Sequence, residues 1–114
     1  MPSAQTHKKE YPAAVTEALR QWGRHIRIAR LRRGLRILDL AERVGVSRFL
    51  IADIEKGKAT VAVGSYVCTL WALGLDDKIK HIADPDNDLE GKALEQVRAP
   101  KTAAKRKKVL DNDF

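Results

Sequence analysis

Arginine and lysine side chains are concentrated in one part of the chain, residues 20–58. This segment carries 11 Lys and Arg residues against 4 Asp and Glu residues, a net charge of +7. Residues 59–97 have a net charge of −4, and residues 98–114 have a net charge of +4. Guanidinium and ammonium groups bind phosphate and carboxylate oxygens, so the first segment is a candidate surface for an anionic partner. A solvated charged face is the alternative, and the motif inside the segment must decide between the two.

Histidine and cysteine, the other residue types that could do chemistry, are few and scattered. His7, His25 and His81 lack the spacing of zinc ligands. Cys68 is the single cysteine, which excludes an internal disulfide and suits a small buried hydrophobic residue. The chain shows neither a glycine-rich phosphate loop nor a nucleophile elbow. We therefore expect no catalytic residue, metal site or cofactor, and a protein that is not an enzyme.

The composition indicates one small soluble domain. The chain has 114 residues, of which 44% are hydrophobic and only 5% aromatic, so the core must consist of Leu, Ile, Val and Ala. Its apolar runs are shorter than the roughly 20 residues that span a bilayer, and the N-terminus lacks an apolar signal core. We expect a cytoplasmic, nucleoid-associated protein that does not bind membranes.

Hydrophobic periodicity predicts short helices and no strands. One face of a first helix, from about Pro12 to Gly34, carries Val15, Leu19, Trp22, Ile26 and Ala29. Gly23 is a possible break in this helix. Further helices are expected at 37–44, 47–56, 63–73, 76–83 and 89–98. In the helix at 63–73 the core candidates are Val63, Val67, Leu70 and Trp71. The predicted fold class is all-α, a compact bundle of about five to six helices.

Residues 37–56 have the pattern of a helix-turn-helix. Ala41 supplies a small residue where two helices cross, Gly45 tolerates a left-handed turn, and Ser47 is an N-cap for the second helix. Apolar residues suited to lock both helices to their neighbours are Leu40, Val44, Val46, Ile51 and Ile54. The alternative is two packed helices of another all-α domain. Such a pair would not require a small residue, a turn glycine, an N-cap and apolar residues all at these spacings.

The segment from Ile26 to Leu75 resembles the Xre family, the Cro/C1-type helix-turn-helix regulators. The matching residues are Arg30, Gly34-Leu35, Asp39-Leu40-Ala41, Val44-Gly45-Val46-Ser47, Ile51, Ile54-Glu55, Gly57-Lys58 and Ala72-Leu73-Gly74. The resemblance implies a lambda-repressor-like DNA-binding domain that reads paired half-sites about 34 Å apart as a homodimer. The Tyr-Pro arm, residues 83–94 and the basic tail resemble HipB-like antitoxins, which implies a HipA-type kinase toxin as a possible partner.

In such a unit the second helix enters the major groove of double-stranded DNA with its N-terminal residues at the base edges. The base-contacting candidates are Arg48, Phe49, Ala52 and Asp53. Arg48 can bind guanine O6 and N7, Phe49 can pack on a thymine methyl group, and Asp53 can accept from cytosine. The alternatives are a phosphate contact for Arg48, a surface groove or dimer contact for Phe49, and an ion pair between Asp53 and Lys56. This helix is also more apolar than the family's usual recognition helix.

Phosphate contacts are expected from the elements that flank the groove. The candidates are Arg36, Arg43, Ser47, Lys56 and Lys58. The family commonly has Gln at the position of Ile37, and Arg36 is a neighbouring substitute. The resemblance also implies that Arg30 and Glu55 form a partly buried ion pair with a structural role. Candidates for the dimer surface are Trp71, Leu75, Ile79 and Ile82, with monomer core as the alternative.

These observations divide the chain into four parts. We expect a mobile N-terminal arm at 1–11, a helix-turn-helix domain at 12–83, an acidic helical extension at 84–99 and a basic flexible tail at 100–114. The predicted function is a sequence-specific transcriptional repressor that binds a palindromic operator as a dimer and autoregulates its operon. The alternatives are an antitoxin that neutralises a HipA-type kinase toxin and a general nucleic-acid-binding basic factor.

Overall fold

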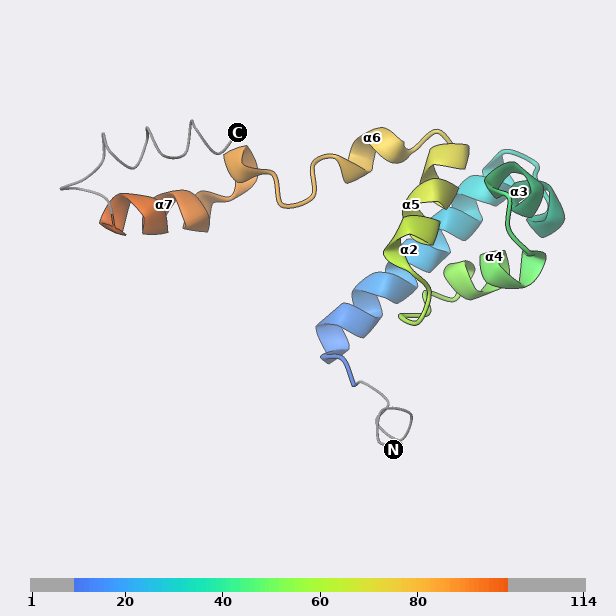
Figure 1. Cartoon of the computed structure of the whole chain (residues 1–114), viewed down its shortest axis with the longest axis horizontal. Coiled ribbons are helices and arrows are strands. Elements are labelled where there is room, and N and C mark those ends of the chain that lie inside the picture. The colour runs from blue at the N-terminus through green and yellow to red at the C-terminus, as the bar shows by residue number, and fades with distance from the viewer. Residues whose placement is uncertain (1–9, 99–114) are drawn as a thin grey trace. The chain divides into compact units, whose positions relative to one another are not determined.

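The computed structural model describes residues 10–98, which form six α-helices, one 3-10 helix and no strand (Figure 1). The helices are α2 (Ala13–Arg32), α3 (Ile37–Val44), α4 (Arg48–Glu55), α5 (Val63–Ala72), α6 (Asp76–Ile79), η1 (Pro85–Asn87) and α7 (Leu89–Arg98). The predicted all-α fold class is therefore confirmed. The predicted tail at 100–114 and nearly all of the predicted arm at 1–11 lie outside the described residues. The chain divides into two compact units, the first ending at Ile79 and the second beginning at Lys80.

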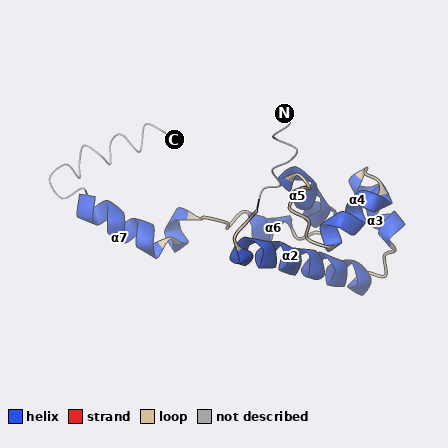
Figure 2. Cartoon of the chain, turned by 90° about the horizontal axis from the view of Figure 1, so that it is seen from below, coloured by secondary structure: helices blue, strands red, loops and turns tan. Residues whose placement is uncertain are grey.

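The core of the first unit is built from one or two apolar residues of each long helix. Fully or almost fully buried are Ile26 and Ala29 of α2, Leu40 and Ala41 of α3, Ile51 and Ile54 of α4, Tyr66 of α5, and Leu73. Burying a side chain of this size contributes about 1.5–3 kcal/mol to folding. Figure 2 shows α2 along one side of this unit, with α3 and α4 together at one end of it. The buried positions of α3 and α4 agree with the inner faces that the sequence predicts.

The long helix α2 runs unbroken through Gly23, so the break that the sequence left possible there does not occur. Gly23 is buried and lies against the backbone at the end of α4, where a Cβ atom would collide with the carbonyl group of Glu55 and the amide of Gly57. The glycine therefore allows close contact between the backbones of α2 and the end of α4, and it does not interrupt α2. Pro12 is the N-cap residue that precedes the helix.

The core of α5 differs from the sequence prediction at two residues. Val63 and Trp71 are 68% and 60% exposed, whereas Tyr66 and Thr69 on the opposite face are buried. The sequence of α5, Val-Gly-Ser-Tyr-Val-Cys-Thr-Leu-Trp-Ala, has no charged residue to mark its outer face. Periodicity of apolar residues therefore could not tell the two faces apart. Tyr66 belongs inside because its ring packs edge-to-face on Trp22, with ring centroids 6.0 Å apart.

The predicted fifth helix is shorter than expected. It ends at Ile79 and not at Ala83, because the chain turns and Ala83 adopts a left-handed backbone with φ of 58°. The amide of Asp84 donates to the carbonyl of His81, which closes this turn.

In the second unit, the helix predicted at 89–98 forms as α7 (Leu89–Arg98). Asp88 caps this helix, because its carboxylate accepts from the amide of Gly91 at 3.0 Å. Its apolar residues Leu89, Leu94 and Val97 are 75%, 55% and 77% exposed.

Candidate nucleic-acid interface

The two helices α3 and α4 meet across a tight turn that follows α3. Gly45 ends α3 with a left-handed backbone at φ of 85°, and its amide donates to the carbonyl of Ala41 at 2.8 Å. Ser47 then begins α4, because its side-chain oxygen accepts from the amide of Leu50 at 3.1 Å. Ala41, Ile51 and Ile54 hold the two helices together in the core. The first turn of α4 thus has a defined direction relative to α3.

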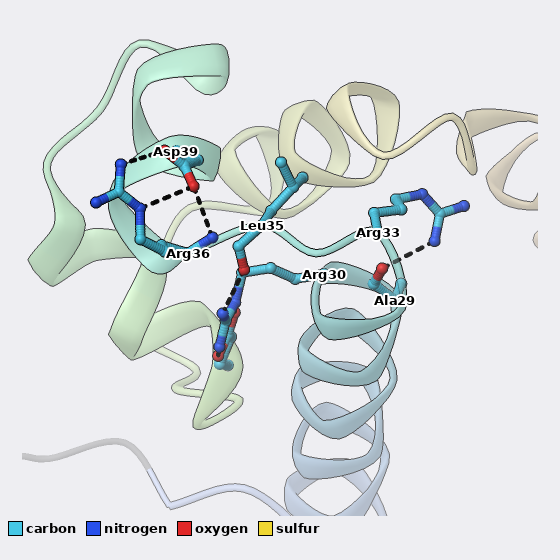
Figure 3. A network of polar contacts seen from close by, with 7 residues as sticks. Ala29, Arg30, Arg33, Leu35, Arg36 and Asp39 are labelled. Carbon is cyan, nitrogen blue, oxygen red and sulfur yellow. Dashed lines mark hydrogen bonds and ion pairs between the residues drawn. The ribbon is translucent and has the colours of Figure 1, made fainter.

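A buried ion pair fixes the far end of α4. Arg30 Nε lies 2.6 Å from Glu55 Oε2, and Arg30 Nη2 lies 3.1 Å from Glu55 Oε1, with side chains only 7% and 8% exposed. Arg30 also donates from Nη1 to the carbonyl of Leu35 at 2.9 Å (Figure 3). The guanidinium therefore joins the end of α2, the loop before α3 and the end of α4. A buried charge pair with this bidentate geometry acts as a rigid structural element.

The exposed face at the start of α4 carries Arg48 and Phe49. Phe49 is 69% exposed, although it is a large aromatic residue, and Arg48 is exposed beside it. The Arg48 guanidinium lies over the Phe49 ring, with its carbon 5.2 Å from the ring centroid. A cation over an aromatic face is weakly attracted to it, which restricts the directions that a long side chain samples. Ala52 and Asp53, one turn further along α4, are partly buried.

Asp53 pairs with Lys58, so the pairing with Lys56 that the sequence suggested is wrong. Gly57 adopts φ of 72°, which turns the chain back over α4. The amide of Lys58 donates to the carbonyl of Asp53 at 3.2 Å, and Lys58 Nζ lies 3.1 Å from Asp53 Oδ1. This helix ending, with a second bond from the Gly57 amide to the Ile54 carbonyl, is a Schellman motif. It places Lys58 beside the exposed face of α4.

Tyr66 supports this loop, and sequence reasoning missed it. Its hydroxyl donates to the carbonyl of Lys58 at 2.6 Å, while its ring is almost fully buried. Burial raises the pKa of the Tyr66 hydroxyl, and the negative charge of Asp53 adds to that shift. The chemistry of tyrosine could have indicated this role from the sequence. Its ring is large and apolar, and its hydroxyl needs a hydrogen-bond partner when the ring is buried. Gly23 of α2 and Gly57 are further positioning residues, because each allows backbone contact between α2 and the end of α4.

Arg36, a predicted phosphate contact, is held at the start of α3. Its guanidinium binds both carboxylate oxygens of Asp39, at 2.9 and 3.1 Å, and its amide donates to Asp39 Oδ2 at 2.8 Å (Figure 3). The hydrogen bonds from Arg36 lower the pKa of Asp39 to about 2. The Arg36 side chain nevertheless remains 78% exposed. It can therefore contact a phosphate from a fixed position, with part of its charge balanced by Asp39.

The other predicted phosphate contacts lie on the surface of the first unit. Arg43 of α3, Ser47 and Lys56 are exposed, and the Lys58 side chain is 49% exposed. The amide groups in the first turn of α4 add donors for an anion, because the first residues of a helix have no partner for their N–H groups within the helix. The first turn of α4 contains no acidic residue.

The predicted dimer residues fall into two groups. Trp71 and Ile82 are 60% and 57% exposed, while Leu75 and Ile79 are partly buried. The alternative that Trp71 belongs to the monomer core is therefore wrong.

Other kinds of site find little support among the described residues. The described residues include no group of three or more His, Cys, Asp or Glu side chains that could hold a metal ion. Over the same part of the chain, no helix is long and apolar enough to cross a membrane.

Comparison with known families identifies the class of protein that this geometry defines. A family profile described as a helix-turn-helix domain matches residues 21–77, which include all of α3, α4 and α5. The chain belongs to this family, and it is a helix-turn-helix DNA-binding regulator. Searches of curated proteins and of solved structures gave no match.

Proposed function

We propose that the protein is a sequence-specific transcriptional repressor that binds a palindromic operator in double-stranded DNA as a homodimer and autoregulates its operon. The observation that carries this proposal is the first turn of α4. Arg48 and Phe49 are exposed there, on a helix whose direction is fixed by the Ser47 cap at one end and the buried Arg30–Glu55 pair at the other. A regulator of this kind acts in the cytoplasm, associated with the nucleoid.

Base recognition follows from the chemistry of these two side chains. The first turn of α4 enters the major groove, where Arg48 donates two hydrogen bonds to guanine O6 and N7. Phe49 packs on the methyl group of a neighbouring thymine, which also removes part of its apolar surface from water. Ala52 lies close to the bases, and its methyl side chain has no polar group that would need a hydrogen-bond partner there. Asp53 has a weaker role in reading cytosine, because Lys58 already binds its carboxylate.

Phosphate contacts surround this reading helix. Arg43 comes from α3, and Arg36 directly precedes that helix. Ser47 and the amide groups of the first turn come from the start of α4, and Lys56 and Lys58 come from its end. These groups therefore precede and follow α4 in the chain. They fix the register of the protein on DNA but carry no sequence information, so they contribute equally to all sequences. Their number predicts a steep loss of affinity with salt.

A footprinting experiment tests the proposal. The wild-type protein should protect two half-sites, about one helical turn apart, in the DNA upstream of its own gene at moderate salt. Random genomic fragments of the same length are the control. If the protein protects no site in the upstream DNA and binds the upstream and random fragments with equal affinity, it is a general nucleic-acid-binding factor.

We propose a second function, that of an antitoxin, because α7 exposes three large apolar side chains. Leu89, Leu94 and Val97 of this ten-residue helix are each more than half exposed, and Leu94 and Val97 lie one turn apart on the same side of it. A helix this short is marginal in water unless its apolar face packs against something. The resemblance to HipB-like antitoxins makes a HipA-type kinase toxin the partner.

Co-expression with the product of the adjacent gene tests this second function. The wild-type chain should co-purify with a neighbouring kinase, and Leu94→Glu should abolish the complex. Lys92→Glu, which also adds a carboxylate to α7 but replaces a charged residue, is the matched control. A complex unaffected by Leu94→Glu would exclude the α7 face as the contact.

A further inference from the structure

The positive charge of residues 20–58 is divided unequally between the long helix α2 and the helix-turn-helix. Residues 20–33, most of α2 and the residue that follows it, hold six arginines and no Asp or Glu, a net charge of +6. Residues 34–58, which contain α3 and α4, hold five Lys and Arg residues against four Asp and Glu residues, a net charge of only +1. A polyanion is attracted by an excess of positive charge, and α2 supplies nearly all of that excess.

Two arginines of α2 have little or no charge compensation from carboxylates. The Arg20 side chain is 62% exposed, and its nearest carboxylate oxygen, on Glu17, is 4.0 Å away. The other oxygen of Glu17 accepts a hydrogen bond from Arg24 at 3.4 Å. Arg27 is exposed, and in the part of the chain that the structure describes no carboxylate pairs with it. The guanidinium groups of Arg20 and Arg27 are therefore available to an external anion.

The contact at Gly23 places these two arginines beside the end of α4. Gly23 lies against the backbone carbonyl of Glu55 and the amide of Gly57. Arg20 precedes Gly23 by three residues and Arg27 follows it by four, so both lie on the same side of α2, about one turn from the contact. Gly57 in turn lies against the backbone of Arg20. Arg20 and Arg27 therefore flank the point where the end of α4 meets α2.

The loop at this point carries two exposed lysines, Lys56 and Lys58. The ammonium group of Lys58 lies 3.1 Å from the carboxylate of Asp53, so part of its charge is already balanced. Arg20 and Arg27 add positive charge on the neighbouring helix. The exposed basic groups thus continue from the end of α4 onto α2.

Phosphate is the anion that fits this arrangement. A guanidinium group can donate two parallel hydrogen bonds to phosphate oxygens, and α2 contains arginine but no lysine. Arg20 and Arg27 are seven residues apart, about 10 Å along the helix axis, which spans about three phosphates of one DNA strand. An acidic protein could bind the same groups. DNA is favoured because a duplex seated on α4 brings phosphates to this side of α2.

We propose that Arg20 and Arg27 bind phosphates of the DNA strand that passes the end of α4. This inference rests on the proposed function, since the DNA must be seated on α4. The two contacts lengthen the bound segment beyond the bases that Arg48 and Phe49 read. They supply a part of the affinity that is equal for all sequences, because phosphates carry no sequence information.

Fluorescence anisotropy of the full-length chain tests the proposal, with a duplex of its upstream DNA and a random-sequence duplex of the same length. Arg20→Gln and Arg27→Gln should each reduce the slope of log affinity against log salt concentration by about one on both duplexes. The double variant should reduce it by about two, with the ratio of the two affinities unchanged. The double variant Arg20→Lys with Arg27→Lys keeps both charges and should retain the wild-type slope.

Arg32→Gln is the matched control. Arg32 is an exposed arginine of the same helix, but it follows Gly23 by nine residues, or two and a half turns, and so lies on the opposite side of α2. Its substitution removes the same charge and should leave the slope unchanged. Thermal unfolding checks that all variants are folded, as expected for exposed positions, and the single variants decide the result if the double variant is unstable.

Unchanged slopes in Arg20→Gln and Arg27→Gln overturn the proposal. An equal reduction in Arg32→Gln also overturns it, because the effect would then come from net charge and not from the position of the arginines. Reduced slopes for Arg20→Gln and Arg27→Gln alone, with equal wild-type affinity for the two duplexes, would support the contacts from α2. That result would overturn sequence-specific repression and leave this inference in place.

Discussion

At the scale of single residues, two exposed arginines of the helix-turn-helix are predicted to act differently. Arg48 is expected to read a base, so Arg48→Ala should weaken operator binding by about 5- to 150-fold and relax discrimination at one position. Arg43 is expected to contact only phosphate. Arg43→Ala should therefore weaken binding to all DNA about equally and reduce the slope of affinity against salt by about one.

Fluorescence anisotropy with an operator duplex and a shuffled duplex separates these two results. Arg48→Ala should lower the ratio of the two affinities, and Arg43→Ala should leave that ratio unchanged. An equal loss on both duplexes for Arg48→Ala would assign Arg48 to phosphate, which is the alternative that the sequence left open.

The Arg30–Glu55 pair provides a prediction about stability. Glu55→Ala leaves a charged guanidinium in a site where the side chain is 7% exposed, so it should lower the free energy of unfolding by about 3–5 kcal/mol. Glu17→Ala is the control, because Glu17 pairs with Arg24 at the surface with side chains about half exposed, and such pairs contribute about 0–1 kcal/mol. Urea denaturation measures both. Similar losses for the two variants would contradict a structural role for the buried pair.

At the scale of helices, the start of α3 is predicted to depend on pH. The pKa of Asp39 lies at about 2 in the folded chain against an ordinary value of 3.8, because Arg36 donates hydrogen bonds to its carboxylate. A lowered folded-state pKa means that the ion pair stabilises the fold above the ordinary value, and that this contribution is lost as the pH falls from 3.8 towards 2.

Asp39→Asn tests this dependence. The variant should melt at a lower temperature than the wild type near neutral pH, and the difference should shrink as the pH falls through that window. An NMR titration of the Asp39 carboxyl should give the lowered pKa directly. A constant difference in melting temperature at all pH values would show that the charge of Asp39 does not stabilise α3.

The contact between α2 and α4 makes Gly23 intolerant of substitution. Helix propensity alone predicts that Gly23→Ala stabilises α2 by about 1 kcal/mol. The added Cβ atom would collide with the backbone of Glu55, so we expect a net loss of about 1–3 kcal/mol instead. Gly64→Ala, at a helical glycine in open space, is the control and should not destabilise the monomer. A stabilised Gly23→Ala variant would mean that α2 and α4 do not approach closely.

Local chemistry made several elements predictable from the sequence. Gly45 ends α3 and Ser47 begins α4 through hydrogen bonds to residues nearby in the chain. Periodicity of the apolar residues predicts the burial of Leu40, Ala41, Ile51 and Ile54. The role of Gly23 and the outward face of Trp71 depend on neighbours distant in sequence. In α5, which has no charged residue, the pattern carried no information about which face is inside.

At the scale of the whole molecule, charge and fold together account for the expected partner. The segment of net charge +7 contains all of α3 and α4, so the basic segment of the chain includes the helix-turn-helix. The sequence could predict this coincidence because charge and motif are both properties of one segment. Which basic groups remain available depends on local ion pairs: Lys58 binds Asp53, and Arg36 binds Asp39.

The central claim is that this surface reads a DNA sequence and does not merely bind polyanions. The most direct test is the affinity of the full-length protein for its own upstream DNA and for a shuffled duplex of the same length and composition, at physiological salt. We predict that the upstream DNA binds at least about 10³-fold more tightly. Equal affinities for the two duplexes would contradict the account.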